Sequence, residues 1–467
     1  MRRMLSLLLG LCIFYSGIQS AHADAAPTLA IEPQFDEAQS FSEGLAGVKI
    51  GKKWGFVDRT GKVVITPAYD WVTSFSEGLA KVGNWERQGN MSFNRQGLID
   101  REGKVIVSPE YKTIRQLKNG LILITKDNIM GLVDQTGKEI VPLSYNSIGE
   151  FYEGLSVVSK DGLFGYIDVT GAEVIPLQFT TAYEFHEGLA GVQSDGNWHL
   201  INRNGEMVMT LPYKSISNVS EGYLQVCNDE ACGYLDVSTG EEVIKPQYYY
   251  VYDFKDGIAR AGKTQSGTYG YIDKYGNVVI PLKYPNTEEY TYKDGIYCVF
   301  PVDGTIGIYE KKNPEKGLMI LPYDGIMPYF SSNPYDQAAN EGILPVMKNG
   351  KWGLVDQEYN EIVEPQYENI DDTFVNGIIR VKKEGKYGFL DMNGFEAIPL
   401  QYEYASKPAE NLILVGSDNM YGFIDKSNQV VIPLQYNKAL GFSEGLAAVS
   451  IKGKWGFISN PLVNSSK

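Results

Sequence analysis

Histidine and cysteine, around which catalytic and metal sites are often built, are scarce in this sequence. Its 467 residues include three histidines and four cysteines. After residue 23 only His186 and His199 remain, and they do not fit a metal-ligand spacing such as His-Glu-x-x-His. No serine or cysteine stands with a base in a recognisable nucleophile motif. The sequence therefore predicts that the chain is not an enzyme and has no metal site and no cofactor.

Positive charge is also in short supply. The 42 Lys and Arg residues are outnumbered by 57 Asp and Glu residues, which gives a formal net charge of −15. Nucleic-acid binding needs clustered Lys and Arg to contact phosphates, so the charge balance predicts no nucleic-acid partner. A strongly acidic surface is instead typical of a protein that stays soluble.

Long apolar runs are absent except at the start of the chain. Two arginines near the start precede an apolar run over residues 5–18, and Ala21 and Ala23 place small residues where a signal peptidase cleaves. We therefore predict that residues 1–23 are a signal peptide. The mature chain, 24–467, is expected in the periplasm, in the extracellular space or at the cell surface. It should have no membrane span after cleavage, because no later run is long enough.

The rest of the chain contains one sequence unit that recurs about twelve times, at a spacing of about 34 residues. Residues 53–58 read Lys-Trp-Gly-Phe-Val-Asp, and residues 454–458 read Lys-Trp-Gly-Phe-Ile. A Pro-x-Tyr element, such as Pro246 and Tyr248, recurs in step with this phrase. His199 replaces the glycine in the fifth unit. The glycine of the phrase recurs at Gly55, Gly97, Gly131, Gly165, Gly233, Gly270, Gly307, Gly353, Gly388, Gly422 and Gly456.

Each unit is predicted to form three short strands. Leu-Ala-x-Val, Trp-Gly-Phe-Val-Asp and Val-Val-Ile-x-Pro have the length and residue types of strands, and no window has a sustained helical period. Asp-x-x-Gly, as in Asp58 to Gly61, predicts a tight turn; its variable inner residues do not supply the ligands of a calcium loop. Proline is expected to end the third strand because it lacks an N–H donor. The Phe-x-Glu-Gly-Leu segment, residues 75–79, is predicted to be a connector with a turn.

Intact Lys-Trp-Gly at residues 53–55, 351–353 and 454–456 resembles the WG-repeat family, a bacterial β-repeat named for its Trp-Gly pair. The resemblance extends over residues 30–459. It implies an exported or surface-linked β array. It implies no defined activity, so it informs the expected fold more than the expected function.

The predicted architecture is an all-β tandem array of about twelve three-stranded antiparallel units. A unit this small cannot bury its apolar face alone, so neighbouring units must stack on it. We expect an open, superhelical, solenoid-like array. The alternative is closure into one or two β-propeller-like rings, with a divide near Lys245 if there are two. Residues 31–35 resemble part of a unit and could complete the last unit, which favours some closure.

Two cysteines are candidates for a disulfide. Aligned on the repeat, Cys227 and Cys232 flank a four-residue hairpin loop, so their side chains could face each other across it. Disulfides persist in exported proteins, and small buried thiols are the alternative. Cys298 is left as the odd cysteine of the mature chain.

Aromatic residues supply the candidate binding site. Most of the 32 tyrosines fall at repeat positions and are assigned to the core. Two groups do not: one lies in a tyrosine-rich connector and the other in the longest insertion, where repeat proteins often bind ligands. A packed cap over a repeat junction is the alternative for both. The candidate residues are Tyr249, Tyr250, Tyr323, Tyr329, Phe330 and Tyr335.

These features predict an exported scaffold that binds protein or cell-envelope polysaccharide. Exposed aromatic rings suit such ligands because they are rigid and amphipathic. A purely structural or spacer protein is the alternative. A glycan-acting enzyme is the least favoured hypothesis, since no pair of carboxylates is placed by a motif.

Overall fold

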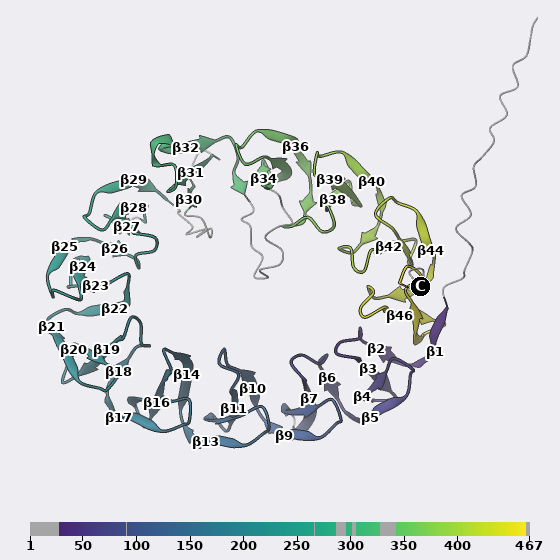
Figure 1. The fold of residues 1–467 in the computed structure, drawn as a ribbon, viewed down its shortest axis with the longest axis horizontal. Coiled ribbons are helices and arrows are strands. Elements are labelled where there is room, and N and C mark those ends of the chain that lie inside the picture. The colour runs from purple at the N-terminus through teal and green to yellow at the C-terminus, as the bar shows by residue number, and fades with distance from the viewer. Residues whose placement is uncertain are drawn as a thin grey trace, which may run out of the picture.

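The computed structural model describes residues 28–89, 91–265, 267–285, 296–300, 305–326 and 342–463. These residues form twelve small antiparallel sheets that succeed one another around a single closed ring (Figure 1). The chain is therefore a twelve-bladed β-propeller, and our expectation of an open superhelical array is wrong. The predicted signal peptide, residues 1–23, lies outside the described residues.

The strands of each sheet are stacked from the middle of the ring to its rim (Figure 1). The innermost strands are β2 (Glu37–Ala38), β6 (Trp71–Val72), β10 (Thr113–Gln116), β14 (Ser147–Tyr152), β18 (Thr181–Ala182), β22 (Ser215–Ser220), β26 (Tyr250–Val251), β33 (Gly325–Ile326), β37 (Asn369–Ile370), β41 (Tyr404–Ala405) and β45 (Lys438–Ala439). The second strands are β3 (Leu45–Ile50), β7 (Leu79–Gln88), β11 (Ile122–Lys126), β15 (Leu155–Lys160), β19 (Leu189–Ser194), β23 (Tyr223–Cys227), β27 (Ile258–Gly262), β30 (Ile296–Val299), β34 (Leu344–Lys348), β38 (Ile378–Lys383), β42 (Ile413–Ser417) and β46 (Leu446–Ile451).

The outer half of each sheet carries the Trp-Gly phrase and the Pro-x-Tyr element. The third strands are β4 (Lys53–Asp58), β8 (Met91–Asp100), β12 (Ile129–Val133), β16 (Leu163–Asp168), β20 (Asn197–Asn202), β24 (Cys232–Asp236), β28 (Tyr269–Asp273), β31 (Ile306–Glu310), β35 (Lys351–Val355), β39 (Lys386–Asp391), β43 (Met420–Ile424) and β47 (Lys454–Ser459). The outermost strands are β1 (Leu29–Phe35), β5 (Val63–Tyr69), β9 (Val105–Tyr111), β13 (Glu139–Tyr145), β17 (Glu173–Phe179), β21 (Met207–Leu211), β25 (Glu242–Tyr248), β29 (Val278–Tyr284), β32 (Leu318–Leu321), β36 (Glu361–Tyr367), β40 (Glu396–Tyr402) and β44 (Val430–Tyr436). A 3₁₀ turn, η1 (Pro314–Lys316), precedes β32.

The prediction of three strands per unit is also wrong. Eleven sheets have four strands, and among the described residues only the sheet β30-β31-β32 has three. The additional strand is the innermost one, and it is often only two residues long, as in β6, where Trp71 pairs with Gly83 and Val72 with Val82. A strand this short shows no alternation of apolar and polar residues, so its sequence was assigned to the connector.

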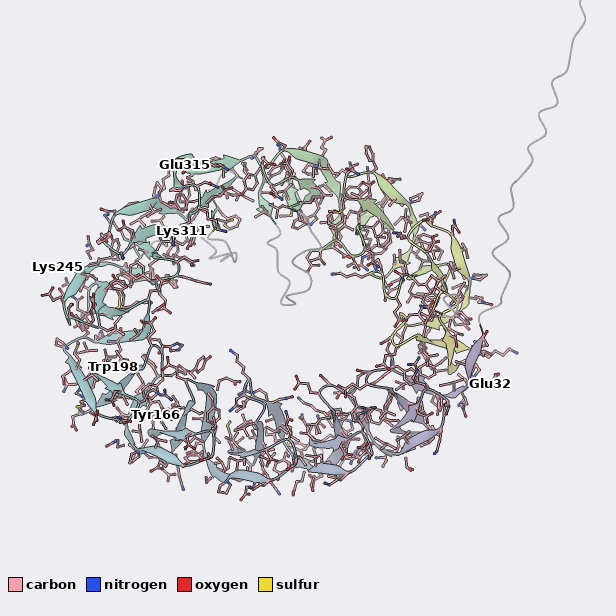
Figure 2. The ribbon with its side chains drawn as sticks, in the orientation of Figure 1. Glu32, Tyr166, Trp198, Lys245, Lys311 and Glu315 are labelled. Carbon is pink, nitrogen blue, oxygen red and sulfur yellow. A yellow bond between two sulfur atoms is a disulfide. The ribbon has the colours of Figure 1, made fainter. Side chains whose placement is uncertain are left out.

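The ring closes because the first strand belongs to the last sheet. Strand β1 pairs antiparallel with β47, placing Leu29 opposite Ile458 and Phe35 opposite Trp455. The sheet order is β1-β47-β46-β45, so the start and the end of the described chain lie in one sheet. An open array would leave the edge of β47 unpaired, and closure removes that exposed edge. Lys245 lies in β25, on the rim of this single ring (Figure 2).

The glycine of the Trp-Gly phrase makes room for the outermost strand. A Cβ atom on Gly55 would lie 2.3 Å from the carbonyl oxygen of Ile65 and 2.6 Å from the nitrogen of Pro67. The pairing of β4 with β5 shifts at this point, as at a β-bulge. The proline does not end the strand, contrary to our prediction: β5 continues through Pro67 to Tyr69. Proline is tolerated there because the strand lies at the edge of its sheet.

The fifth unit has a histidine in place of this glycine, and its outer strands pair differently. His199 pairs directly with Thr210, and the neighbouring residues of β20 and β21 stay in regular register beside it. The His199 side chain is buried, with Nδ1 3.1 Å from the hydroxyl oxygen of Thr210. Here the pairing lacks the first of the two register shifts that β4 and β5 show, and it keeps only the second, between Leu200 and Ile201.

Aromatic pairs between neighbouring sheets build the core. Phe56 of β4 packs against Phe75, which lies just before β7 of the next sheet, with ring centroids 4.8 Å apart. Phe41 and Phe457 form the same contact across the closure, at 4.9 Å. Such edge-on aromatic pairs add to the stabilisation from buried area. The other pairs of this kind are Tyr166–Phe185, Tyr234–Phe254, Tyr271–Tyr297 and Phe423–Phe442.

A repeated Glu-Gly turn links neighbouring sheets at six junctions among the described residues. Glu43 has a φ of 53° and Gly44 a φ of 83°, so both residues of the predicted turn are left-handed. The carboxylate of Glu43 accepts a hydrogen bond of 2.9 Å from the backbone N–H of Gly78 in the following turn. The carboxylate of Glu444 accepts the same bond from Gly44 and so spans the closure. The other links are Glu153–Gly188, Glu187–Gly222, Glu221–Gly257 and Glu410–Gly445.

The predicted Asp-x-x-Gly turns are confirmed. Asp58 Oδ1 accepts hydrogen bonds from the backbone N–H of Thr60 at 2.9 Å and of Lys62 at 3.1 Å. The hydroxyl of Thr60 also donates to it, and this bond is the main cause that lowers the pKa of Asp58 below its usual 3.8. The pKa values of Asp134 and Asp168 are lowered in the same way.

These turns are expected to make the protein less stable in acid. Each carboxylate has a lower pKa when folded than the unfolded value of 3.8, so it stabilises the fold above that pH. The contribution is lost as the pH falls through the folded pKa. The melting temperature should therefore fall as the pH is lowered from about 4 to about 2.

Replacing Asp58, Asp134 and Asp168 together with asparagine should flatten this decline. Asn202 already forms the same turn in the fifth unit, where its Oδ1 accepts hydrogen bonds of 3.0 Å from Asn204 and 3.1 Å from Glu206. The turn is thus compatible with a side chain that does not titrate. Thermal unfolding of both proteins across this pH range is the measurement. An unchanged pH dependence in the triple variant would contradict the assignment.

Candidate functional site

The tyrosine-rich connector predicted from the sequence joins β25 to β26. Tyr248 ends β25 and is buried, whereas Tyr249 and Tyr252 are each 39% exposed. Tyr250 begins β26 and is half-buried. The connector thus exposes two tyrosine side chains next to β26. This strand is the innermost of its sheet and lies toward the middle of the ring (Figure 1).

The exposed tyrosines belong to a larger group of rings. The centroids of Tyr249 and Tyr250 are 4.7 Å apart, and those of Tyr250 and Tyr269 are 5.9 Å apart. Tyr252 lies 6.4 Å from Tyr269, which begins β28. We call Tyr249, Tyr250, Tyr252, Tyr269 and Arg260 the tyrosine–arginine cluster.

Arg260 of β27 lies at the centre of this cluster. Its Cζ atom is 4.0 Å from the ring centroid of Tyr269 and 4.7 Å from that of Tyr252. The backbone explains the placement, because the N–H of Tyr252 donates to the carbonyl of Arg260 at 3.1 Å. Aromatic rings this close attract a guanidinium through their π faces. The buried Nε atom has no hydrogen-bond partner among the described residues.

The phenol of Tyr250 stays protonated at physiological pH. Desolvation raises the pKa of Tyr250, and the neighbouring Tyr249 and Tyr269 add to the effect. A neutral tyrosine offers both a ring face and a hydroxyl that can donate a hydrogen bond. The guanidinium of Arg260 and the tyrosine rings together form a surface that can hold a polar ring or an anionic group.

Tyr323, the one predicted residue of the long insertion that the structure describes, does not join this cluster. Tyr323 is 5% exposed and packs with Ile326 and Leu344 in the core, which corrects our assignment of this residue to a binding loop. Its hydroxyl lies 3.4 Å from a carboxylate oxygen of Glu361. The remaining candidates of that insertion, at positions 329, 330 and 335 (Tyr329, Phe330 and Tyr335), lie outside the described residues.

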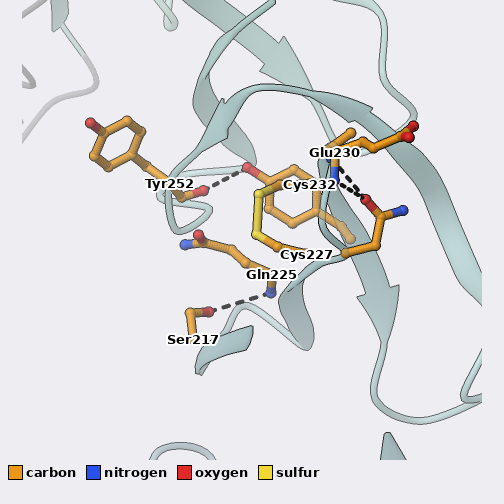
Figure 3. Close-up of a disulfide and its surroundings, with 9 residues drawn as sticks. Ser217, Gln225, Cys227, Glu230, Cys232 and Tyr252 are labelled. Atoms are coloured by element: carbon orange, nitrogen blue, oxygen red, sulfur yellow. Dashed lines mark hydrogen bonds between the residues drawn. A yellow bond between two sulfur atoms is a disulfide. The ribbon is translucent and has the colours of Figure 1, made fainter. Parts of the chain in front are cut away.

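A disulfide stands in the sheet that precedes the cluster. Cys227 of β23 and Cys232 of β24 are joined across their hairpin (Figure 3). Cys232 pairs with Tyr248 of β25, and the hydroxyl of Tyr234 donates to the carbonyl oxygen of Tyr252 at 2.6 Å. The disulfide-bonded sheet therefore supports the backbone of the cluster. Cys298 is buried in another sheet.

Replacing Cys227 and Cys232 together with serine is expected to lower the free energy of unfolding by about 2 kcal/mol, because a cross-link restricts the unfolded chain. Urea unfolding of the variant and the wild type is the measurement. Reductant should bring the wild type to the level of the variant and leave the variant unchanged. Identical unfolding curves, or alkylation of both cysteines in unreduced protein, would contradict the disulfide.

Side chains that could ligate a metal are not grouped in the described part of the chain. No group of three or more His, Cys, Asp or Glu side chains is arranged there to hold a metal ion. No helix within the described ranges is long and apolar enough to cross a membrane. The imidazole of His186 packs against the aromatic ring of Tyr152, and the two ring centroids are 5.1 Å apart.

Sequence reasoning missed Tyr269 and Arg260, whereas Tyr252 belongs to the tyrosine-rich connector that the sequence had indicated. Tyr269 was assigned to the core because it occupies the aromatic position of the repeat. Arg260 was not singled out, although a signal existed: it occupies the position that Gly47 and Ala448 fill in the first and last units. An arginine in place of these small residues marks a departure from the first and last units, although the position is variable and also holds Arg380 and Leu414.

A model of the WG containing repeat matches this chain in eleven segments. The matched residues are 24–54, 54–84, 97–128, 130–164, 164–198, 200–230, 233–263, 269–300, 352–387, 387–420 and 421–455. Together they span most of the chain. A comparison with curated proteins finds no significant match.

Several solved structures are similar only in general arrangement. An extracellular domain assigned to a one-component system of B. thetaiotaomicron is 12% identical, with a TM-score of 0.22, and the match covers 92% of this chain and 68% of that one. Dihydro-heme d1 dehydrogenase NirN is 14% identical, with a TM-score of 0.32 and coverage of 62% and 75%. The Pan2 WD40 domain of Neurospora crassa is 14% identical, with a TM-score of 0.26 and coverage of 53% and 86%. At such TM-scores these likenesses support no conclusion about function.

Proposed function

Since this chain belongs to the family of WG containing repeats, we propose that it is an exported scaffold that binds protein or cell-envelope polysaccharide. The signal-like residues 1–23 support export, and N-terminal sequencing of the secreted protein should find Asp24 first. Any other first residue would contradict the cleavage site. We further propose that the protein is not an enzyme, since no motif places a nucleophile, a catalytic acid–base pair or a metal.

The observation that supports binding is the exposure of the tyrosine–arginine cluster. Most aromatic side chains of the repeat are buried between sheets, where they hold the ring together. Tyr249 and Tyr252 are both exposed, and Tyr252 lies beside Arg260, so these two tyrosines are not explained by packing alone. Exposed tyrosines grouped with an arginine are typical of surfaces that recognise a ligand.

The test compares the wild type with a Tyr249→Ala/Tyr252→Ala variant on arrays of defined envelope polysaccharides and purified envelope proteins. The double variant should lose binding, because both ring faces are removed. Tyr275→Ala is the matched control, since Tyr275 is exposed in the same sheet but outside the cluster. Binding that survives in the double variant would contradict this site. A wild type that binds nothing would contradict the proposed function.

A structural or spacer role is the second candidate function. The contacts that the repeated residues make within the ring favour it. The repeated glutamates, aspartates, glycines and aromatic residues all have contacts that build or close the ring. Such a protein would present a rigid disc and need no ligand. Empty arrays together with concentration-dependent self-association, measured by analytical ultracentrifugation, would support this function over the first.

A further inference from the structure

Two sheets of the ring carry an arginine at the same repeat position. Arg260 lies in β27 and Arg380 in β38. The two positions are equivalent because, in both sheets, the residue that follows the innermost strand donates its N–H to the carbonyl oxygen of the arginine. Tyr252 donates to Arg260 at 3.1 Å, and Asp371 donates to Arg380 at 3.0 Å. The two arginines therefore project from equivalent points of equivalent sheets.

The guanidinium of Arg380 is fully engaged within the protein. Its Nη2 and Nε atoms donate to Asp371 Oδ1 at 2.8 Å and 3.2 Å. Asp371 is buried, and Nη1 of the arginine donates to the carbonyl of Ala405 in the next sheet. This geometry shows what an arginine at this position binds when a carboxylate is available: a charge-assisted pair of hydrogen bonds.

Arg260 has no such carboxylate at the equivalent position. Tyr252 occupies the place of Asp371, so a ring stands where the other arginine has an anion. The second ring is common to both sheets, since Arg380 lies over Tyr387 as Arg260 lies over Tyr269. Its buried Nε atom has no hydrogen-bond partner among the described residues. The arginine side chain as a whole is half-buried, so a carboxylate from outside the chain would gain charge-assisted hydrogen bonds at the terminal nitrogens of its guanidinium.

We propose that the tyrosine–arginine cluster binds a carboxylate-bearing sugar, a uronic-acid unit of an envelope polysaccharide. The carboxylate pairs with Arg260 as Asp371 pairs with Arg380. The sugar ring packs on the exposed faces of Tyr249 and Tyr252. This inference rests on the proposed scaffold function and names the class of its ligand.

Two features favour a sugar of this kind over other anions. An extended peptide would bind by adding a strand, but β26 is only two residues long and offers little backbone for pairing. The net charge of −15 opposes a densely charged polymer. The cluster therefore fits a polysaccharide in which uronic acids are separated by neutral sugars.

Calorimetric titration of chain 24–467 with an alternating uronic and neutral oligosaccharide tests the inference. The same oligosaccharide with its carboxylates reduced to alcohols is the reference ligand. We expect the acidic form to bind about tenfold or more tightly than the reduced form, because only it can pair with Arg260. Equal affinity for the two forms would overturn the inference.

Two variants assign this preference to the cluster. Tyr252→Asp gives Arg260 a carboxylate partner like the one that Asp371 gives Arg380, and Arg260→Gln removes the guanidinium. Each variant should bind the acidic and the reduced oligosaccharide equally. Cooperative thermal unfolding of each variant shows that it is folded. Tyr404→Ala is the matched control. Tyr404 packs against Tyr421 in the way that Tyr250 packs against Tyr269. Its sheet has Leu414 at the position of the arginine, so this substitution should leave the preference for the acidic oligosaccharide unchanged. A preference that survives both variants, or is lost in the control, would overturn the assignment.

The outcomes also separate this inference from the proposed function. If neither oligosaccharide binds but the arrays yield another ligand that depends on Tyr249 and Tyr252, the uronic-acid assignment fails and the scaffold function stands. If an acidic peptide binds with the same dependence on Arg260 and the oligosaccharide does not, the assignment to a sugar fails. If nothing binds at all, both fail.

Discussion

A chain that begins at Asp36, and so lacks β1, is expected to open the ring. Strand β1 supplies the outer edge of the last sheet and buries Ile31 and Phe35 against it. Losing these two side chains and the pairing with β47 should lower the free energy of unfolding by on the order of 5 kcal/mol. The exposed edge of β47 should also promote association between molecules. Thermal unfolding, together with small-angle scattering to monitor the shape, is the measurement.

A chain that begins at Thr28 is the control, because it keeps every residue of β1. It should melt at the same temperature as the longer chain 24–467 and scatter as a closed ring. The closure also includes the hydrogen bond from Gly44 to Glu444 and the contact of Phe41 with Phe457. If the chain without β1 keeps its melting temperature and its radius of gyration, β1 does not close the ring.

Gly165→Ala is expected to destabilise the protein strongly for a single added methyl group. The new Cβ atom would lie 2.6 Å from the carbonyl oxygen of Ile175 and 2.8 Å from the carbonyl carbon of Pro176. Both are backbone atoms of β17, so the strand itself must move. Overpacking of this kind costs about 2–3 kcal/mol, which urea unfolding resolves.

Gly441→Ala is the matched control for this substitution. Gly441 has no heavy atom within 4 Å of a built Cβ, so the added methyl group meets open space. Its stability should change by less than about 0.5 kcal/mol. Equal effects at Gly165 and Gly441 would contradict the role given to the Trp-Gly step.

The sequence was sufficient for the repeat but not for its closure. The recurring glycines and the Asp-x-x-Gly turns identified the units and their number, because these residues are required by local backbone geometry. Ring closure depends on pairing between residues separated by most of the chain, such as Phe35 with Trp455. The only indication of closure in the sequence was that residues 31–35 resemble part of a repeat unit. This resemblance does not distinguish a closed ring from an open array.

The candidate site was predicted in part, for a similar reason. Tyr249 and Tyr250 were noticed because they depart from the repeat. Arg260 and Tyr269 occupy regular repeat positions, and their neighbourhood is set by the pairing of three strands. Tyr323 shows the opposite error: it lies in an irregular segment yet is buried. Departure from a repeat therefore locates a variable segment, but it does not tell which of its side chains reach the surface.

Closure has a further consequence for how this protein comes apart. In a linear repeat array the end units have one neighbour, so unfolding can begin by fraying at either end. Here one sheet, β1-β47-β46-β45, holds both ends of the described chain. The hydrogen bond from Gly44 to Glu444 links this sheet to the sheet of β2–β5, in the same way that other neighbouring sheets are linked. Loss of any one sheet then breaks two interfaces at once. We therefore expect the ring to lack a frayed end, and native-state hydrogen exchange to show comparable protection at the closing sheet and at sheets halfway round.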